Sequence, residues 1–445
     1  MRIEQLRLEE RGQRVRAVAR VVWEDNDRPT DDYYFEVDKQ YADSISANPD
    51  AFLVACIMPA LRYGERRIAV EGEICPYLKS GLETSMALIR HWYAKNGDRA
   101  PVTIEAKSRA SEPLSKTSKR SAFFLTGGID SLSTLRLNRL NYPSDHPASV
   151  RDGIIIFGLE VDDPTAFQHV VDLLSALAEQ ADFHLLPVYT NVRYLDDDWV
   201  FWADEFEAAV LSSVVHALSQ RLSNAFIGSS FDYPALHPHG SHPLLDPNYS
   251  SYDLRIHHDS VALSRLEKTR VLADWDGALQ FLRVCNRSEH YRSGVLNCGR
   301  CEKCLRTLTA LLILDKLDQA RAFAHREVTA DLIRQNVYLS KTEFPFWQEL
   351  IEPLRNKGRH DLVEALRHPM NAYRGQTGWK SSIKAFDRQY LRGSLYQMKR
   401  ALTWMAPIDN PARNGIGASV VPWFYSALSP GEFVSGTVEL ALGLI

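Results

Sequence analysis

The sequence predicts an α/β fold organised around a doubly wound parallel sheet, and three observations lead to this fold class. Short apolar segments alternate with helical patterns from about residue 119 to residue 318. Those segments are rich in β-branched residues without polar alternation, which is typical of strands buried on both faces. A Gly-Gly turn joins the first such strand to the helix after it. We therefore expect a parallel sheet with helices on both faces.

Residues 1–118 predict a small N-terminal α+β domain that ends in a linker. A polar turn, EDNDRPTDD, separates two strand patterns, which indicates a hairpin. The linker is the basic, apolar-poor stretch from Lys107 to Arg120. The expected elements are strands at Arg14–Trp23, Tyr33–Val37 and Arg67–Ile74, and helices at Pro49–Tyr63 and Ser80–Asn96.

Residues 119–318 carry the alternating pattern of strands and helices. The expected strands are Ala122–Leu125, Gly153–Leu159, Leu185–Val188, Ala225–Ile227 and Leu254–His257. The expected helices are Leu132–Leu140, Thr165–Gln180 and Trp199–Leu222. Residues 319–445 are expected to be mostly helical as far as Trp404 and then to form a tail rich in Pro, Gly and Ser. The basic segment Arg388–Arg400 is interpreted as a solvated helix face.

The composition is that of a soluble globular protein. The chain has 445 residues, enough for two or three domains, with 45% hydrophobic and 24% charged residues. Its net charge of −4 argues against a broad nucleic-acid-binding surface. It contains no apolar run of about 18 residues, so no membrane span is expected. The N-terminus has no apolar signal-peptide segment, and a cytoplasmic location is expected.

A glycine-rich loop between the first strand and helix of the central region is a candidate phosphate site. Gly127 and Gly128 let the backbone approach a phosphate closely, and the following helix N-terminus favours an anion. Thr126 and Ser131 add hydroxyl donors, while Asp130 could cap the helix or hold Mg²⁺. No Gly-Lys-Ser/Thr follows, so this is not a Walker loop. A plain Gly-Gly turn with a capping residue is the structural alternative.

Four of the six cysteines form the second candidate site. They are Cys285, Cys298, Cys301 and Cys304, with a Cys-x₂-Cys spacing on either side of Cys301. Four thiolates suit tetrahedral Zn²⁺. Gly299 allows the tight turn between Cys298 and Cys301. An iron–sulfur cluster is the main alternative, because thiolates also hold such clusters. Four protein ligands leave no open position, which favours a structural metal.

The loop Thr126-Gly-Gly-Ile-Asp-Ser131 resembles the SGGxDS loop of the PP-loop (N-type) ATP pyrophosphatases, with Thr in place of the first Ser. The resemblance covers about 200 residues, from Ser121 to about Leu312. It implies ATP and Mg²⁺ as cofactors, and cleavage of ATP between the α and β phosphates. A substrate oxygen would attack the α-phosphorus, and an amine, ammonia or sulfur would then displace the adenylate.

The same resemblance implies roles for residues outside the loop. Lys268, near Arg265 at a helix start, would reach the phosphates; a solvated lysine is the alternative. The residues that follow the second strand, where these families place the adenosine, are Gly158, Leu159 and Glu160. The residues that follow the fourth strand, where these families have a second glycine loop, are Gly228, Ser229 and Ser230.

The run CGRCEKCLRT resembles the zinc element of the cyano-deazaguanine synthase family, with Arg306 at the arginine position. This resemblance implies ATP-dependent activation of a carboxy-deazaguanine, followed by transfer to ammonia. Relatives in antiviral defence operons are thought to attach a deazaguanine to the N-terminal amine of a partner protein. The chain differs in its front domain, its tail, its first cysteine spacing and the long loop Phe231–Asp253. These differences bear on the substrate more than on the chemistry.

The long loop carries His237, His239 and His242. A second metal site is possible there, but a loop that covers the substrate is favoured, with Tyr233 or His242 in contact with it. His258 could be a general base, and a polar cluster at a strand end is the alternative.

The predicted catalytic residues are Asp130, Ser131, Lys268 and Arg306. Two other functions stay open. One is a PP-loop enzyme that modifies tRNA or a sugar; thiolation normally needs a cysteine, and only Cys56 and Cys75 lie outside the cluster. The other is a non-enzymatic ATP-binding scaffold that contains zinc.

Overall fold

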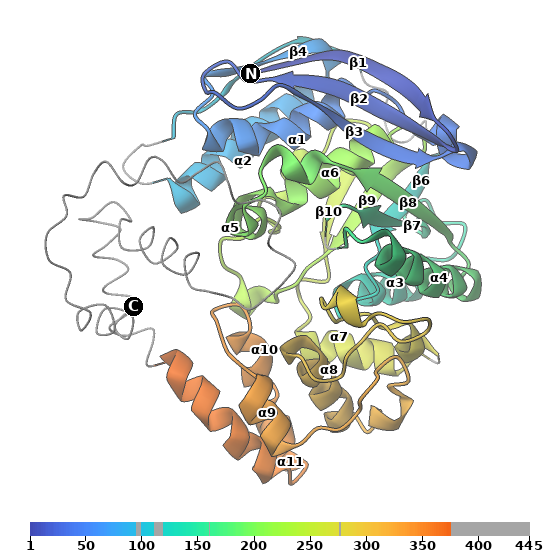
Figure 1. Cartoon of the computed structure of the whole chain (residues 1–445), viewed down its shortest axis with the longest axis vertical. Coiled ribbons are helices and arrows are strands. Elements are labelled where there is room, and N and C mark those ends of the chain that lie inside the picture. Colours follow the sequence, from blue (N-terminus) through green and yellow to red (C-terminus); the bar gives the residue numbers. More distant parts are fainter. Residues whose placement is uncertain (95–98, 111–118, 160, 276, 375–445) are drawn as a thin grey trace, which may run out of the picture. The chain divides into compact units, whose positions relative to one another are not determined.

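The computed structural model describes residues 1–94, 99–110, 119–159, 161–275 and 277–374. Its central feature is a ten-stranded sheet with the order β10-β9-β6-β7-β8-β3-β2-β1-β4-β5 (Figure 1). The strands are β1 Arg2–Arg11, β2 Arg14–Val22, β3 Asp31–Asp38, β4 Arg67–Ile74, β5 Thr103–Ser108, β6 Arg120–Phe124, β7 Val150–Phe157, β8 His184–Thr190, β9 Leu222–Gly228 and β10 Arg255–Asp259. The prediction of an α/β fold is confirmed.

The half of the sheet formed by β10, β9, β6, β7 and β8 is parallel throughout. From β6 the chain adds β7 and β8 on one side, then returns to place β9 and β10 on the other side. The order of winding therefore reverses at β6. The carboxyl ends of β6, β7 and β9 meet at this reversal, which is where open α/β sheets place their ligands.

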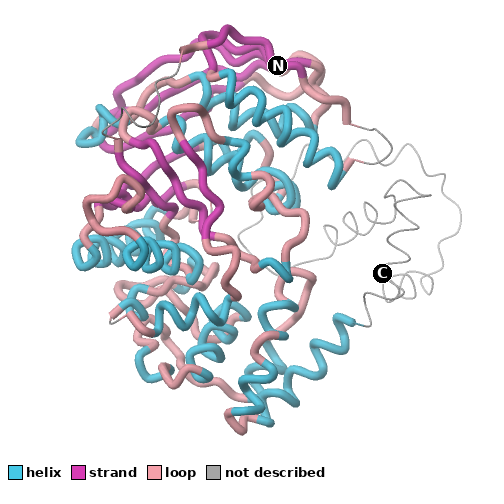
Figure 2. Tube along the Cα trace, turned by 180° about the vertical axis from the view of Figure 1, so that it is seen from behind, coloured by secondary structure: helices cyan, strands magenta, loops and turns pink. Residues whose placement is uncertain are grey.

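Helices cover both faces of this parallel half (Figures 1 and 2). On one face lie α3 (Ile129–Asn141) and α4 (Pro164–Ala181); on this side the ring of Phe123 packs edge-on against Phe183, with centroids 5.4 Å apart. On the other face, α1 (Pro49–Arg62), α2 (Pro76–Tyr93) and α6 (Glu207–Ala217) share a hydrophobic core with Ala122 and Phe124 of β6. Alternate side chains of β6 thus serve two separate cores.

The N-terminal strands continue the same sheet. Strand β3 pairs antiparallel with β8 through Phe35 with Thr190 and Glu36 with Tyr189. The predicted hairpin is confirmed as β2 and β3, while β1 and β5 were not predicted. The chain forms two compact units, one of Met1–Tyr338 with Thr342–Leu366 and one of Leu339–Lys341 with Arg367–Ile445. The predicted boundaries near residues 118 and 318 both fall within the first unit, and most of the predicted linker, 111–118, lies outside the described residues.

The prediction of a single helix over Trp199–Leu222 is wrong in detail. The chain forms α5 (Trp199–Phe201), a π-helical turn (Trp202–Phe206) and α6, and Leu222 already belongs to β9. Gly240 of the long loop explains the wide turn. Its N–H donates to the carbonyl of Ala203 at 2.7 Å, and its carbonyl accepts from the N–H of Ala208 at 2.9 Å. Gly240 of the long loop therefore replaces hydrogen bonds that a regular α-helix would form within itself.

The helices that follow β10 are α7 Arg265–Ala273, α8 Glu302–Ile313, α9 Ala330–Asn336, α10 Phe344–Gln348 and α11 Ile351–Asn356. The last three lie within the region 319–445, for which the sequence predicts a mostly helical structure. No helix within the described residues is long and apolar enough to cross a membrane. The tail after residue 374, including the basic segment Arg388–Arg400 and the helical prediction as far as Trp404, lies outside the described residues.

Candidate functional site

The glycine-rich loop lies at the carboxyl end of β6, where the winding of the sheet reverses. Strand β6 ends at Phe124, and α3 begins at Ile129 with Gly128 as its N-cap. Gly127 has φ of +78°, a conformation that residues with a Cβ rarely adopt. A Cβ at Gly127 would also lie 3.1 Å from the Cβ of Arg283. The loop therefore needs glycine for both its backbone angle and its packing.

The loop presents hydrogen-bond donors around a helix N-terminus. Among the residues that the structure describes, none accepts a hydrogen bond from the main-chain N–H of Ile129 or Asp130. The hydroxyls of Thr126 and Ser131 are 3.3 Å apart, and the Ser131 hydroxyl also donates to the carbonyl of Gly128 at 3.1 Å. Unsatisfied N–H groups and the positive end of the helix dipole favour an anion at this position.

Asp130 is held between two cations of α7. Nη2 of Arg265 lies 2.9 Å from Oδ2, and Nζ of Lys268 lies 3.6 Å from Oδ1. Nζ of Lys268 also donates to the carbonyl of Ser229, at 2.5 Å. The Lys268 side chain is fully buried, and this burial lowers its pKa. Lys268 therefore links Asp130 of α3 to Ser229, the residue that follows β9.

Arg306 of α8 joins this group through an aromatic ring. Its guanidinium carbon lies 4.5 Å from the ring centroid of Phe346, and that of Arg265 lies 4.7 Å from the same centroid. Nη1 of Arg306 is 3.4 Å from Oε1 of Glu302, and burial lowers the Arg306 pKa. We call Arg265, Lys268 and Arg306 the cation cluster. The structure thus brings the four predicted catalytic residues into one region around the start of α3.

The predicted adenosine positions lie at the carboxyl end of β7. Gly158 has φ of +94°, and a Cβ there would lie 2.4 Å from the carbonyl oxygen of Thr190, so a tight turn requires this glycine. Leu159 lines a cavity of about 90 Å³ beside Thr126, together with Phe167 and Arg283. Small-molecule sites usually enclose about 300–1,000 Å³, so this cavity would have to open to take a nucleoside. Glu160 lies outside the described residues.

Gly228 and Ser229 have structural contacts at the end of β9. A Cβ at Gly228 would lie 3.0 Å from the carbonyl oxygen of Asp130 and from Oγ1 of Thr134. The glycine therefore lets β9 approach the first turn of α3. The Ser229 hydroxyl is buried and donates to the carbonyl of Phe231 at 2.6 Å. These contacts explain both residues without a ligand.

The long loop packs through its histidines. The rings of His237 and His239 contact Phe231, with centroids 4.5 and 5.6 Å away, and Phe231 stacks on Phe346 at 5.3 Å. In the described part of the chain, the cysteine cluster is the sole group of metal-ligand type with suitable geometry, so these histidines form no second metal site there. His242 is buried against Trp92, whereas the Tyr233 side chain is exposed.

His258 belongs to a buried polar cluster. Its Nδ1 lies 2.8 Å from Oδ2 of Asp246, whose other oxygen accepts from the main-chain N–H of His242 at 2.8 Å. The Ser241 hydroxyl also donates to Asp246, at 2.8 Å. Nε2 of His258 is buried and has no hydrogen-bond partner within the described residues. The alternative interpretation of a polar cluster at a strand end therefore matches the geometry, and sequence reasoning missed its centre, Asp246.

The four cysteines converge as the spacing predicts. Their sulfur atoms all lie within 4.8 Å of one another, with Cys285 to Cys301 at 3.8 Å and Cys298 to Cys304 at 3.9 Å. Tetrahedral zinc with Zn–S bonds of 2.3 Å requires sulfur–sulfur distances of about 3.8 Å. Hydrogen bonding with Cys301 and Cys304 lowers the pKa of Cys285. The prediction of one four-cysteine group that could hold a metal ion such as zinc is confirmed.

Residues next to the cysteines hold this arrangement in place. Oδ1 of Asn297 accepts from the N–H groups of Val284 and Cys285 at 2.8 and 3.2 Å, so the residue before Cys298 also orients Cys285. The main-chain N–H of Cys301 donates to Sγ of Cys298 at 3.3 Å. Gly299 has φ of +74°, and a Cβ there would lie 2.0 Å from the carbonyl oxygen of His325. The turn therefore requires glycine, both for its positive φ and because a side chain would clash with His325.

Two residues that sequence reasoning missed connect the cysteine group to the glycine-rich loop. Arg283 donates from Nη1 to the carbonyl of Thr126 at 2.9 Å and from Nε to the hydroxyl of Tyr291 at 2.9 Å. The Tyr291 hydroxyl donates to the carbonyl of Cys285 at 2.5 Å. The one indication in the sequence was the position of Arg283, two residues before a ligand.

Comparison of the chain with models of protein families, with curated proteins and with solved structures gave no match.

Proposed function

We propose that the chain is an ATP pyrophosphatase-type ligase that activates a carboxylate as its adenylate and passes it to a nitrogen nucleophile. The observation that carries the proposal is the anion-binding loop Thr126–Ser131, at the winding reversal of the sheet, with the cation cluster beside it. A loop of unpaired N–H groups flanked by buried cations suits a leaving group of high negative charge. Pyrophosphate is such a group.

The first step would form an acyl adenylate. A carboxylate oxygen of the substrate attacks the α-phosphorus of ATP, and the bond from that phosphorus to the bridging oxygen breaks. Pyrophosphate leaves with the electron pair. The N–H groups of Ile129 and Asp130 and the hydroxyl of Ser131 would hold its oxygens, while Arg265 and Arg306 offset the charge that develops.

The second step would form a carbon–nitrogen bond. An amine or ammonia attacks the carbonyl carbon of the adenylate, AMP leaves, and the nitrogen loses a proton. The resemblance of the cysteine element to that of the cyano-deazaguanine synthase family supports a carboxy-deazaguanine-like nucleobase as substrate. The acceptor would be ammonia or an amine of a partner protein, because each supplies a neutral nitrogen nucleophile.

The metal ions differ in how well the residues fit them. The four thiolates fit zinc, and zinc there would brace the segment that carries Arg283 and Tyr291. Asp130 does not fit Mg²⁺ in this arrangement, since its two oxygens face Arg265 and Lys268. No step is therefore derived through Mg²⁺.

The two cysteines outside the four-cysteine group argue against a thiolation enzyme. Cys56 is fully buried, and that burial raises its pKa. Cys75 is buried, and its sulfur accepts a hydrogen bond from the N–H of Tyr252 at 3.3 Å. A sulfur carrier needs an accessible thiolate, which neither residue offers.

Pyrophosphate release and intact-protein mass spectrometry test the proposal. Purified protein receives ATP, Mg²⁺ and carboxy-deazaguanine, with and without ammonia, and with proteins encoded by neighbouring genes. We expect pyrophosphate and AMP, with either an amide or nitrile product or a mass gain on a partner. Ser131→Ala should lower the rate by about 10²-fold, as loss of one transition-state hydrogen bond does, whereas Ser80→Ala on the exposed face of α2 should not. No ATP turnover under any condition would favour a non-enzymatic scaffold.

A further inference from the structure

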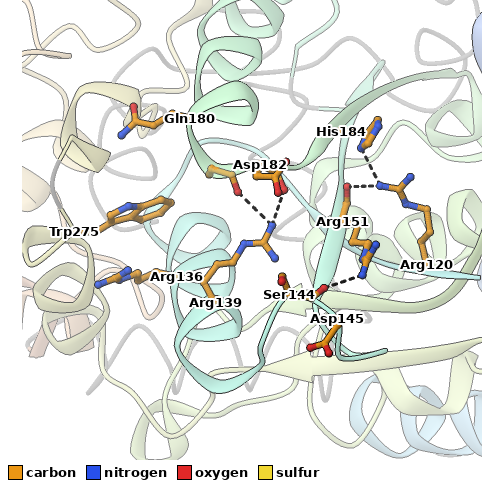
Figure 3. A pocket seen from close by; sticks show the side chains of 11 residues that line it. Arg120, Arg136, Arg139, Ser144, Asp145, Arg151, Gln180, Asp182, His184 and Trp275 are labelled. Atoms are coloured by element: carbon orange, nitrogen blue, oxygen red, sulfur yellow. Dashed lines mark hydrogen bonds between the residues drawn. The ribbon is translucent and has the colours of Figure 1, made fainter.

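A second cavity lies at the opposite edge of the parallel sheet from the phosphate loop. It encloses about 630 Å³, within the range of small-molecule sites. The amino ends of β6, β7 and β8 border it, together with the second half of α3 and the end of α4 (Figure 3). Its lining residues are Arg120, Arg136, Arg139, Ser144, Asp145, Arg151, Gln180, Ala181, Asp182, His184 and Trp275.

The lining carries an excess of positive charge: four arginines and two aspartates. Arg120 is already paired, because its Nε lies 3.1 Å from Oδ2 of Asp152. Within the described residues, no carboxylate lies within ion-pair distance of Arg136, Arg139 or Arg151. Asp145 and Asp182 also line the cavity, but among the described residues neither forms an ion pair with these three guanidinium groups. The excess of positive charge therefore favours an anionic ligand.

Main-chain carbonyls hold three of the arginines in place. Arg139 donates from Nη2 to the carbonyl of Asp182 at 3.0 Å, Arg151 donates to that of Ser144 at 2.7 Å, and Arg120 donates to that of Arg151 at 3.1 Å. Burial lowers the pKa of Arg120 and of Arg139. Each guanidinium has five N–H donors, so these bonds orient the groups and leave donors for a ligand. Such preorganisation reduces the entropy cost of binding.

A flat surface flanks the charged part of the cavity. The guanidinium carbon of Arg136 lies 5.7 Å from the ring centroid of Trp275, and Nε of Arg136 is buried without a hydrogen-bond partner among the described residues. Figure 3 shows Trp275 and Arg136 at one end of the cavity, Arg120 and Arg151 at the other, and Arg139 between them. Aromatic rings and guanidinium planes are the usual stacking surfaces for nucleobases.

We propose that this cavity binds a nucleotide, with its base against Trp275 and Arg136 and its phosphate among Arg120, Arg139 and Arg151. The two ends of the cavity match the two parts of such a ligand: a planar, polarisable group and an anion. The site is separate from the proposed ATP site, because the amino and carboxyl ends of β6 lie at opposite edges of the sheet. Nucleotide binding in this cavity does not depend on the proposed ligase function.

Calorimetric titration of the full chain with GMP, guanosine and inorganic phosphate tests the proposal. We expect GMP to bind at least about ten-fold more tightly than either part alone, because only GMP engages both ends of the cavity. The variant Arg136→Gln/Arg151→Gln should weaken GMP binding by at least about ten-fold, and Trp275→Ala should reduce GMP binding toward that of phosphate. Ser131→Ala in the phosphate loop should leave GMP binding unchanged.

The matched control is Arg334→Gln/Arg355→Gln, which makes the same change in net charge at two exposed helix positions. It should bind GMP as the wild type does, and thermal unfolding should confirm that both double variants are folded. Equal GMP affinity in the cavity variant and the wild type would overturn the proposal. So would phosphate binding as tight as GMP binding, or no GMP binding by the wild type.

Discussion

Nη1 of Arg283 donates a hydrogen bond of 2.9 Å to the main-chain carbonyl of Thr126, the first residue of the glycine-rich loop Thr126–Ser131. The main-chain N–H of Arg283 also donates to the carbonyl of Gly127, at 2.8 Å. Through the Tyr291 hydroxyl, the same guanidinium is joined to the carbonyl of Cys285. The conformation of the loop therefore depends on the segment that enters the cysteine site, although the two motifs are far apart in the sequence.

Replacing Arg283 by Gln should loosen the loop and leave the metal in place. Arg283 is buried, and the substitution removes bonds from a charged group, so we expect a loss of stability of about 1–3 kcal/mol. Pyrophosphate release should fall by at least about ten-fold, because loop N–H groups that are out of position no longer stabilise the leaving group. Thermal unfolding, pyrophosphate release and elemental analysis measure the three effects.

Arg287→Gln is the matched control, since this arginine is exposed and four residues away. It should change neither stability nor activity. An Arg283→Gln protein with wild-type turnover would show that the loop does not rely on this contact. Loss of metal together with loss of activity would place the effect at the cysteine site.

Gly299→Ala should abolish metal binding through a local clash. The new Cβ would lie 2.0 Å from the carbonyl oxygen of His325, so the turn that carries Cys298 and Cys301 must move. Gly294→Ala is a close control: its φ is +73°, against +74° for Gly299, but nothing lies within 4 Å of the added Cβ. Elemental analysis should find metal in the control and little in Gly299→Ala. Equal metal contents would mean that the turn adapts.

Removal of the metal should destabilise the protein. Four thiolates without a cation would repel one another, and metal that binds only the folded chain adds its binding free energy to stability. A strong chelator should therefore lower the melting temperature of the wild type, and Cys298→Ser should be less stable and insensitive to the chelator. Cys56→Ala, at a buried site in α1, should keep its metal and its response to the chelator. A chelator with no effect on the wild type would argue against a structural metal.

The sequence was most informative where the chemistry is local. Cysteine spacing identified the complete ligand group, and β4 was predicted with its observed bounds, Arg67–Ile74, because its pattern is strong. The strand–glycine–helix order also placed the loop correctly at the end of β6. In each case the residues that specify the feature lie within about 20 positions of one another.

Features that depend on distant contacts could not be predicted. Strand β1 is rich in charged residues and lacks a continuous apolar face, so its pairing with β2 decides its structure. The π-helical turn before α6 results from Gly240, a residue of the inserted loop. The contacts of Arg283 and Asp246 likewise depend on how separate segments meet. The sequence marks Arg283 only by its position two residues before Cys285, and no short pattern marks Asp246.

His239 should make the protein sensitive to acid. Burial lowers its pKa from 6.5 to about 4, and its Nδ1 accepts a hydrogen bond from the N–H of Ser241 at 3.4 Å, which requires the neutral ring. The unfolded chain binds a proton near pH 6.5 and the folded chain near pH 4, so stability falls as the pH falls through this window. The full effect at pH 4 is at most ~3 kcal/mol, at 1.36 kcal/mol per pKa unit.

His239→Gln removes this titration while it keeps a polar side chain in the loop. The stability of the wild type relative to this variant should therefore decrease between pH 7 and pH 4.5, as measured by urea unfolding at each pH. Glu207 lies nearby, with Oε2 3.8 Å from Nδ1 of His239, and would reduce the effect by favouring the protonated ring. His290→Gln, at an exposed position, should show no such pH-dependent difference. A constant difference between wild type and His239→Gln would mean that the ring can be protonated without unfolding the loop.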